Sequence, residues 1–481
     1  MIRPRAGAGG LILDGGPLNG GLGASIIVTT YNQLPYTKMC LESIAAFVPA
    51  GYELVVVDNA SADGTREYLK GLAAADPGMK VIFNRRNRGF PAAANQGLRA
   101  ASKDVLVLLN NDMVVSRNWM ENLLNCLAEA GAGMVGPMCN FISGAQRIPT
   151  TYKDMGEMHA FAEAFNRPDP SKWRRATRLG GGSLAISRKL VEAVGYFDER
   201  FTPGNYEDDD YSLRAVAAGF KLFIAGDTFV HHFGNTTLRR DGDKAYENLL
   251  ERNGRLLTAK WHTDDCGVAY FRSALADAVP PGGSRALDLC CKAGALGLEL
   301  KNRGLSEVVG VETGRRLAMV ATHSLDRVFL ASPERVRLPY PEGYFDRVVV
   351  AGAFERAHDP WRLLRSVAGW LAPGGYLVTM VPNVSHVSVL ANLLGGRWDY
   401  GLGGVLQPPH LRFFTMSTFV RGLREAGFQM VSARGLGGEL NETTLDFLRD
   451  LEAVARKYGL APGNLPMEGQ ALELLVVAKR T

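Results

Sequence analysis

The chain of 481 residues has no long apolar run and no cysteine pattern typical of a metal site. No apolar stretch approaches the roughly 20 residues that a membrane-spanning helix needs, and the first residues lack the continuous apolar core of a signal peptide. The six cysteines are scattered, without a Cys-x-x-Cys pair that a matching Cys or His pair would complete to a zinc site. These absences predict a cytoplasmic protein with free thiols, and they leave peripheral contact with a membrane open.

An excess of charge of one sign is also missing, since the formal net charge is only +5 and the basic residues are mostly dispersed. Such a balance favours neither nucleic acid nor another strongly anionic partner. The hydrophobic fraction of 46% is high enough, at this length, for two or three domains that each bury a core. We therefore expect several domains and no nucleic-acid partner.

Strands and helices alternate regularly after a flexible, glycine-rich leader predicted at residues 1–23. Short apolar strands end in polar residues, and helical stretches follow them. The expected strands are 25–30, 53–57, 81–83 and 104–109, and the expected helices are 35–46, 65–75 with Thr65 as N-cap, and 92–101. This alternation predicts an α/β fold with a parallel sheet, whose polar strand ends converge on one rim.

The stretch from Val107 to Val115 is the central feature of this pattern, because an apolar strand there ends abruptly in Asn110, Asn111 and Asp112. In open α/β sheets ligands bind at the carboxyl ends of the strands, where loops line a crevice. A lone Asp at such an edge indicates no particular ligand, so the interpretation of Asp112 depends on the sequence upstream and on a second acidic cluster about a hundred residues downstream.

Further polar residues follow downstream in the same half of the chain. Four consecutive acids occupy positions 207–210, and a strand expected at 222–225 is followed by His231 and His232. A helix expected at 244–261 ends this part of the chain. We assign residues 24–262 to a first domain.

A second α/β pattern begins after a predicted linker at residues 263–284, which contains two prolines followed by two glycines. Buried strands are expected at 286–289, 308–311, 347–350, 376–380 and 472–477. The second domain therefore spans residues 285–481. No short repeat indicates a solenoid.

The ordered segments of the first domain resemble the inverting, family 2-type glycosyltransferases with the GT-A fold, especially the rhamnosyltransferase-like members. The segments that carry the resemblance are residues 25–32, 56–65, 87–90, 95–97, 109–112 and 207–210. The resemblance implies transfer of a hexose from a nucleotide diphosphate sugar, UDP- or dTDP-linked, to a glycan or glycoconjugate acceptor in polysaccharide assembly. It also implies a bound Mn²⁺ or Mg²⁺.

The resemblance assigns roles to individual residues. Asp208 corresponds to the catalytic base that deprotonates the acceptor hydroxyl. Asp112 takes the last position of the metal motif, Asn110 stands where the family has its first acid, and either His232 or His231 completes the metal ligands, with His232 favoured. The donor-binding positions are Thr30, Tyr31, Asn32, Asp58, Arg88, Asn95, Asn111, Gly181 and Gly182.

Other readings of some of these residues stay open. Asp58 could instead cap the turn that follows its strand, and the arginines at 85–88 could form a solvated surface. We expect Asp209 or Asp210 to be a solvated acid at a helix start, which the macrodipole favours. A reading of a different class makes both domains binding modules without catalysis.

The second domain resembles the class I S-adenosylmethionine-dependent methyltransferases, through residues 286–297, 309–312, 338–346, 371–375 and 409–415. The resemblance implies a Rossmann-like fold in which Asp288, Gly294 and Glu312 bind S-adenosylmethionine. The family has glycines where this chain has Cys290 and Lys292. Two alternatives therefore stay open: an active methyltransferase, or a non-catalytic docking or dimerisation module that would make a homo-oligomer.

Overall fold

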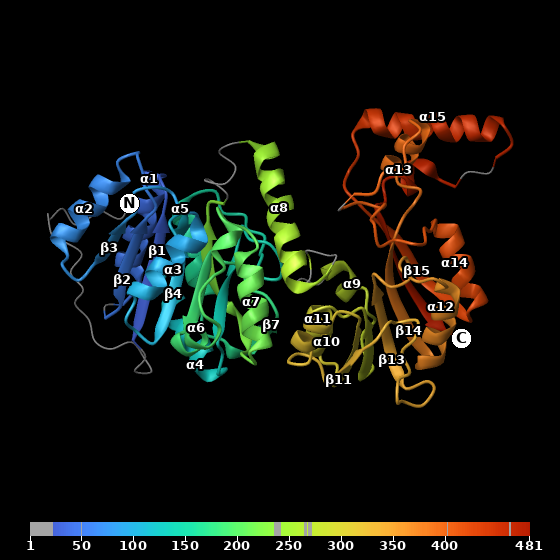
Figure 1. The fold of residues 1–481 in the computed structure, drawn as a ribbon, viewed down its shortest axis with the longest axis horizontal. Coiled ribbons are helices and arrows are strands. Elements are labelled where there is room, and N and C mark those ends of the chain that lie inside the picture. The colour runs from blue at the N-terminus through green and yellow to red at the C-terminus, as the bar shows by residue number, and fades with distance from the viewer. Residues whose placement is uncertain are drawn as a thin grey trace. The chain divides into compact units, whose positions relative to one another are not determined.

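The computed structural model describes residues 23–49, 51–234, 242–263, 267, 272–401, 403–460 and 463–481. The predicted leader lies outside these residues except for Gly23, as does part of the predicted linker. The described residues divide into two compact units, one on each side of the boundary between residues 270 and 271 (Figure 1). No helix among them is long and apolar enough to cross a membrane.

The first unit is built on a mixed sheet. In chain order its strands are β1 (Ala24–Thr30), β2 (Glu53–Asp58), β3 (Lys80–Phe83), β4 (Val105–Asn110), β5 (Met113–Val114), β6 (Met134–Cys139), β7 (Trp173–Ala176), β8 (Ser183–Ser187) and β9 (Leu222–His232). They lie in the order β3-β2-β1-β4-β8-β6-β9-β5, and β7 pairs with β9. The strands β3, β2, β1 and β4 are parallel, as predicted, whereas β8 runs antiparallel between β4 and β6.

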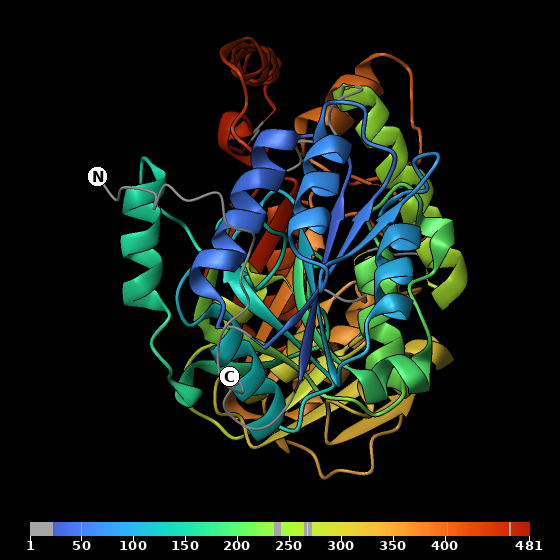
Figure 2. The ribbon, with the colours of Figure 1, turned by 90° about the vertical axis from the view of Figure 1, so that its left-hand side faces the viewer.

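The helices of the first unit are α1 (Leu34–Phe47), α2 (Thr65–Ala75), α3 (Phe90–Ala100), α4 (Trp119–Glu129), α5 (Met155–Phe165), α6 (Arg188–Val194), α7 (Glu207–Ala217) and α8 (Asp243–Trp261). Figure 2 shows the blue helices of this unit lying against the sheet. Close packing of α3 depends on Gly97, because a Cβ there would lie 2.2 Å from Ile27 Cγ2. Thr65 is not the N-cap of α2: the helix begins at Thr65, and Asp63 Oδ1 accepts hydrogen bonds from its backbone N–H and its hydroxyl.

The second unit contains the sheet β12-β11-β10-β13-β14-β16-β15. Its strands are β10 (Arg285–Leu289), β11 (Glu307–Glu312), β12 (Arg327–Leu330), β13 (Phe345–Ala351), β14 (Leu371–Pro382), β15 (Phe428–Leu436) and β16 (Glu473–Arg480). The first five are parallel, while β16 runs antiparallel to both β14 and β15. Strand order reverses at β10, which has β11 on one side and β13 on the other.

Helices flank this second sheet. They are α9 (Ser273–Asp277), α10 (Ala295–Asn302), α11 (Arg315–Ala321), α12 (Pro360–Trp370), α13 (Val387–Leu394), α14 (Met416–Glu425), α15 (Glu442–Lys457) and α16 (Leu465–Glu468). The core is formed by strand residues such as Leu287, Val309 and Val348, which are fully buried. Strands buried on both faces explain why the sequence shows continuous apolar runs here.

Candidate active site

A cavity of about 630 Å³ lies in the first unit at the carboxyl ends of β1 and β4. Residues 29–31 and 110–112 line it from these two strands, and residues 180–182 line it just before β8. The start of α7 and His232 at the end of β9 complete this part of its wall. The volume is in the range typical of small-molecule sites, and the predicted rim of polar strand ends is therefore also the edge of a cavity.

Asp112 and His232 face each other in this cavity, with 3.2 Å between Asp112 Oδ1 and His232 Nε2. The carbonyl of Phe141 accepts a hydrogen bond from His232 Nδ1 at 2.7 Å, so Nε2 is the nitrogen presented to Asp112. Burial disfavours the charged imidazole, but the hydrogen bond and the charge of Asp112 outweigh it and raise the pKa of His232 to about 10.

His231 points away from Asp112 towards an aromatic cluster, because successive side chains alternate along β9. Its Nδ1 lies 2.6 Å from the Tyr152 hydroxyl, and its ring contacts the ring of Phe233 edge-on. Burial, followed by repulsion from His232, lowers the pKa of His231 to about 4. Of the two histidines predicted as alternative metal ligands, the structure brings His232 to Asp112.

The residues around Asp112 suit a divalent cation. Asn110 Oδ1 is buried and has no hydrogen-bond partner, so a buried oxygen is left for another ligand. Together with Asp112 and His232 it forms a carboxylate, imidazole and amide set, which Mn²⁺ and Mg²⁺ accept. Within the described ranges no three His, Cys, Asp or Glu side chains gather as a metal site, so these three residues would need further ligands from the substrate or from water.

The acidic run begins α7 and is buried, with Asp208 only 9% exposed. Asp208 Oδ2 accepts hydrogen bonds from the Gly181 backbone N–H at 2.9 Å and from Arg178 Nη2 at 3.3 Å. Arg178 Nε donates to Asp209 Oδ1 at 2.7 Å. One guanidinium thus holds two neighbouring carboxylates at the cavity wall.

Burial favours the neutral forms of Glu207 and Asp209. Desolvation, followed by the charge of Asp208, raises the pKa of Glu207 well above its ordinary value. Desolvation also raises the pKa of Asp209 to about 7, although Arg178 opposes the shift. Asp209 and Asp210 are 2% and 0% exposed, so the expectation that one of them is a solvated helix start is wrong.

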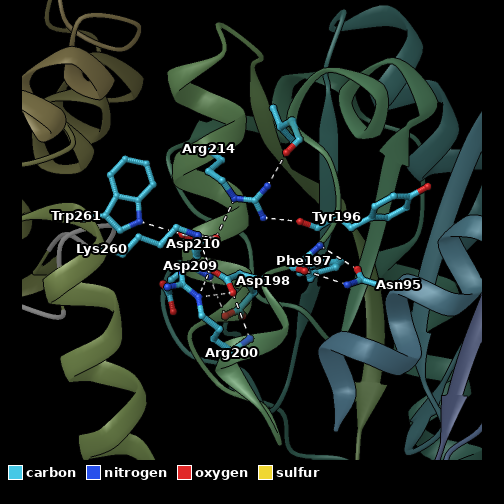
Figure 3. Close-up of polar contacts among 12 residues, drawn as sticks. Asn95, Tyr196, Phe197, Asp198, Arg200, Asp209, Asp210, Arg214, Lys260 and Trp261 are labelled. Carbon is cyan, nitrogen blue, oxygen red and sulfur yellow. Dashed lines mark hydrogen bonds and ion pairs between the residues drawn. The ribbon is translucent and has the colours of Figure 1, made fainter. Parts of the chain in front are cut away.

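Asp210 is not among the cavity's lining residues and belongs to another polar network (Figure 3). It accepts hydrogen bonds from Arg214 Nε at 2.9 Å, from Lys260 Nζ at 2.8 Å and from Trp261 Nε1 at 3.1 Å. Lys260 also donates to Asp198 Oδ2 at 2.7 Å. The network fastens the end of α8 to α7 and to the loop before it, while the start of α8 supplies Tyr246 and Leu250 to the cavity.

The predicted donor-binding residues divide into two groups. Those that line the cavity are Thr30, Tyr31, Asn111, Gly181 and Gly182. Those that are not among its lining residues are Asn32, Asp58, Arg88 and Asn95.

The second group has structural contacts that account for its polarity. Asp58 is fully buried, pairs with Arg66 at 3.1 Å and accepts from the Ser61 backbone N–H, which is the turn-capping alternative. The Asn95 side chain donates to the Phe197 carbonyl and to Glu199, and it accepts from the Phe197 backbone N–H. The side chain of Asn32 accepts from the Ala62 backbone N–H. Arg88 is half exposed and lies 3.8 Å from Glu199.

Sequence reasoning did not identify Arg178, Tyr246 or Leu250 as cavity residues. Arg178 is one of several basic residues between 174 and 178, and nothing in that run singles it out. Tyr246 and Leu250 belong to the apolar stripe of α8, whose spacing also suits a purely structural helix. Their place in the cavity depends on how α8 packs.

In the second unit the residues predicted to bind S-adenosylmethionine lie together at the carboxyl ends of β10 and β11. Asp288 and Glu312 are 2% and 6% exposed, and Gly294 precedes α10 in a left-handed conformation. Desolvation raises the pKa of Asp288 to about 7. Glu312 Oε2 accepts a hydrogen bond from the Lys292 backbone N–H at 2.9 Å, which links the loop after β10 to the end of β11.

Comparison with known proteins agrees with these two architectures. Residues 25–194 match the family model described as glycosyl transferase family 2, and residues 261–433 match the model described as methyltransferase domain. The chain joins a family 2 glycosyltransferase domain to a methyltransferase domain.

Individual relatives of the glycosyltransferase domain are distant. The glycosyltransferase AglE of Haloferax volcanii is 26% identical over 214 residues, which are 43% of this chain and 66% of AglE. Over the first three curated relatives the matched regions span between 30% and 66% of the relative's own length.

Two solved structures are similar to parts of the chain. A crystal structure of GalNAc-T7 with UDP, GalNAc and Mn²⁺ is 20% identical, with 48% of each chain covered and a TM-score of 0.38. A methyltransferase from Mesorhizobium loti is 21% identical, with 43% of this chain and 96% of that chain covered and a TM-score of 0.31.

Proposed function

We propose that the glycosyltransferase domain transfers a hexose from a UDP- or dTDP-linked sugar to a hydroxyl of a glycan or glycoconjugate, with inversion at the anomeric carbon. The observation that carries this proposal is the shared cavity, in which the Asp208 carboxylate and the Asp112–His232 pair line the same space. The proposal includes a cytoplasmic location with peripheral membrane contact, and it leaves the oligomeric state open.

Asp208 acts as the general base. An inverting transfer is a single displacement, in which the acceptor oxygen forms the new bond to the anomeric carbon while the bond to the diphosphate breaks. The hydroxyl proton moves to Asp208, which the Gly181 N–H and Arg178 hold in place. Because a Cβ on Gly181 would lie 3.3 Å from Asp208 Cβ, glycine keeps the backbone close to this carboxylate.

The remaining residues bind and orient the donor. Asp112, His232 and Asn110 would hold Mn²⁺ or Mg²⁺, which when bound neutralises charge on the leaving diphosphate. Thr30, Tyr31 and Asn111, at the ends of β1 and β4, line the part of the cavity that we assign to the nucleoside.

The test measures turnover of the full chain with UDP- and dTDP-sugars in the presence of Mn²⁺. Asp208→Asn should lower kcat by about 10²- to 10⁴-fold and leave donor affinity nearly unchanged, because general acid–base catalysis contributes that much. Asp76→Asn is the matched control, since Asp76 is similarly buried at 9% exposure and is not among the cavity's lining residues. Unchanged turnover by Asp208→Asn would overturn the proposal.

A further inference from the structure

The methyltransferase domain has its candidate ligand crevice at β10, where strand order reverses. In doubly wound sheets ligands bind outside the carboxyl ends of the strands at such a point. Three segments border it here: the loop 290–294 after β10, Glu312 at the end of β11, and Gly352 after β13. A nucleoside cofactor needs open backbone at the loop and a carboxylate free to accept ribose hydroxyls.

The loop after β10 has the backbone of a glycine loop but carries side chains. Cys290, Lys292 and Gly294 all have positive φ, at 61°, 50° and 83°. Only glycine adopts this region without strain, and strain of this kind persists where surrounding contacts hold the backbone. Cys290 and Lys292 thus add atoms at positions where the backbone of a glycine loop would approach a ligand.

The Cys290 side chain spans the reversal point. Its Sγ donates a weak hydrogen bond to the Gly352 carbonyl at 3.7 Å, which links the loop after β10 to the loop after β13. Burial raises the pKa of the Cys290 thiol well above its usual range, so the proton that makes this contact is retained at neutral pH. The thiol therefore occupies space between the two strands where a ligand would enter.

Glu312 is already occupied by its own chain. Its Oε2 accepts from the Lys292 backbone N–H at 2.9 Å, and its Oε1 accepts from the Gly314 N–H at 2.7 Å and from the Thr313 hydroxyl at 3.3 Å. These three donors leave Glu312 few acceptor positions for the hydroxyls of a ribose. The charge of Lys292 is close enough to oppose the rise in the pKa of Asp288, and a cation there repels the sulfonium of S-adenosylmethionine.

We infer that the methyltransferase domain does not bind S-adenosylmethionine, because Cys290 and Lys292 fill and charge the crevice that its fold provides. The inference does not depend on the proposed glycosyl transfer, since none of its residues belongs to the first unit.

Calorimetry on the full chain tests it, with S-adenosylmethionine and the uncharged S-adenosylhomocysteine as probes. The unaltered protein should give no saturable heat up to about 1 mM of either compound. The double variant Cys290→Gly/Lys292→Gly should bind both compounds with a Kd at least ~10-fold below that limit. Lys292→Met removes the charge but keeps a side chain. This variant should bind S-adenosylmethionine less tightly than the double glycine variant does.

Cys291→Ala is the matched control, because Cys291 is the neighbouring buried cysteine and has no positive φ; it should not gain binding. Saturable micromolar binding of S-adenosylmethionine by the unaltered protein would overturn the inference. So would a double glycine variant that is folded, as judged by its circular dichroism and thermal unfolding, but gains no binding.

Discussion

Asn253 on α8 donates its side-chain amide to the carbonyl of Gly204 at 2.9 Å, and thereby ties α8 to the loop that leads into Asp208. The same amide lies 3.2 Å from the Phe201 carbonyl and 3.1 Å from the Asn205 carbonyl, and Asn253 is fully buried. Residues 203–206 of this loop line the cavity. A helix far along the chain therefore shapes one wall of the site.

Replacing Asn253 with Asp should impair the acceptor side of the reaction. A carboxylate keeps the shape but cannot donate to the three carbonyls, so the loop before Asp208 should shift. Because small misplacements at a reacting centre can cost up to about 100-fold, we expect kcat/KM for the acceptor to fall by roughly 10- to 100-fold while donor affinity stays unchanged.

Asn122→Asp serves as the control for losing a buried asparagine, because Asn122 donates to the Asp227 carbonyl and is not among the cavity's lining residues. Steady-state kinetics with both substrates varied separate the two effects. A parallel loss of donor and acceptor affinity would indicate general unfolding and contradict a positioning role.

His232 and His231 should differ sharply in metal binding. His232→Gln removes the imidazole that faces Asp112, and we expect Mn²⁺ affinity in the presence of UDP to fall about 10- to 100-fold, as is typical for disrupted metal sites. His231→Gln, one residue away but directed at Tyr152, should leave Mn²⁺ affinity unchanged. Titration followed by electron paramagnetic resonance measures both, and equal losses would show that the assignment of the two rings is wrong.

Asp210 should matter for stability more than for chemistry. It is fully buried and accepts hydrogen bonds from Arg214, Lys260 and Trp261, so Asp210→Ala removes the acceptor that these three side chains share. Because both cations are partly exposed and Lys260 keeps Asp198 as a partner, the loss should be about 1–3 kcal/mol of the free energy of unfolding. Urea unfolding with hydrogen exchange of α7 measures it.

Glu251→Ala, which removes an exposed partner of Arg255 on the same α8, should have little effect on the free energy of unfolding. If the two variants were equally stable, the network in Figure 3 would not be what holds α8 to α7.

The local sequence pattern was sufficient to predict the alternation of strands and helices in both units. It was not sufficient to predict which distant strands pair with one another. The four parallel strands β1 to β4 follow from the recurrence of strand, polar end and helix within residues 24–110. The antiparallel direction of β8 and β16 depends on which strands they meet, and no local pattern encodes that. The same limit explains why β9 continues to His232 although the sequence indicated a strand only at 222–225.

In the candidate site, too, local motifs predicted some of the residues, whereas others depend on tertiary packing. The place of Asp112 beside His232 agrees with the ordered motifs, because each motif ends a strand at one edge of the sheet. Asp58 ends β2 and Asn95 lies within α3, and both are buried. A buried polar side chain can equally hold a loop in place, and the sequence does not distinguish this use from ligand binding. Arg178 reaches Asp208 only through tertiary packing.

The stability of the methyltransferase domain should fall as pH rises through neutrality. Burial raises the pKa of Asp288 to about 7, and the charge of Glu312 adds to this, while a hydrogen bond from Gly297 and the charge of Lys292 oppose it. Because the pKa in the folded state is above that of the unfolded chain, stability is fully present below about pH 4 and is lost as pH rises through 7, by at most about 4 kcal/mol. Asp288→Asn removes this ionisation and should be more stable than the unaltered protein at pH 8, but not at pH 4.

Asp346→Asn provides a control of opposite sign. Hydrogen bonds from Ser284 and Arg285 overcome desolvation and lower the pKa of Asp346, so the contribution of Asp346 to stability is lost as pH falls. Thermal unfolding from pH 4 to pH 8 measures all three proteins, and a parallel pH dependence of Asp288→Asn and the unaltered chain would show that Asp288 does not titrate in this range.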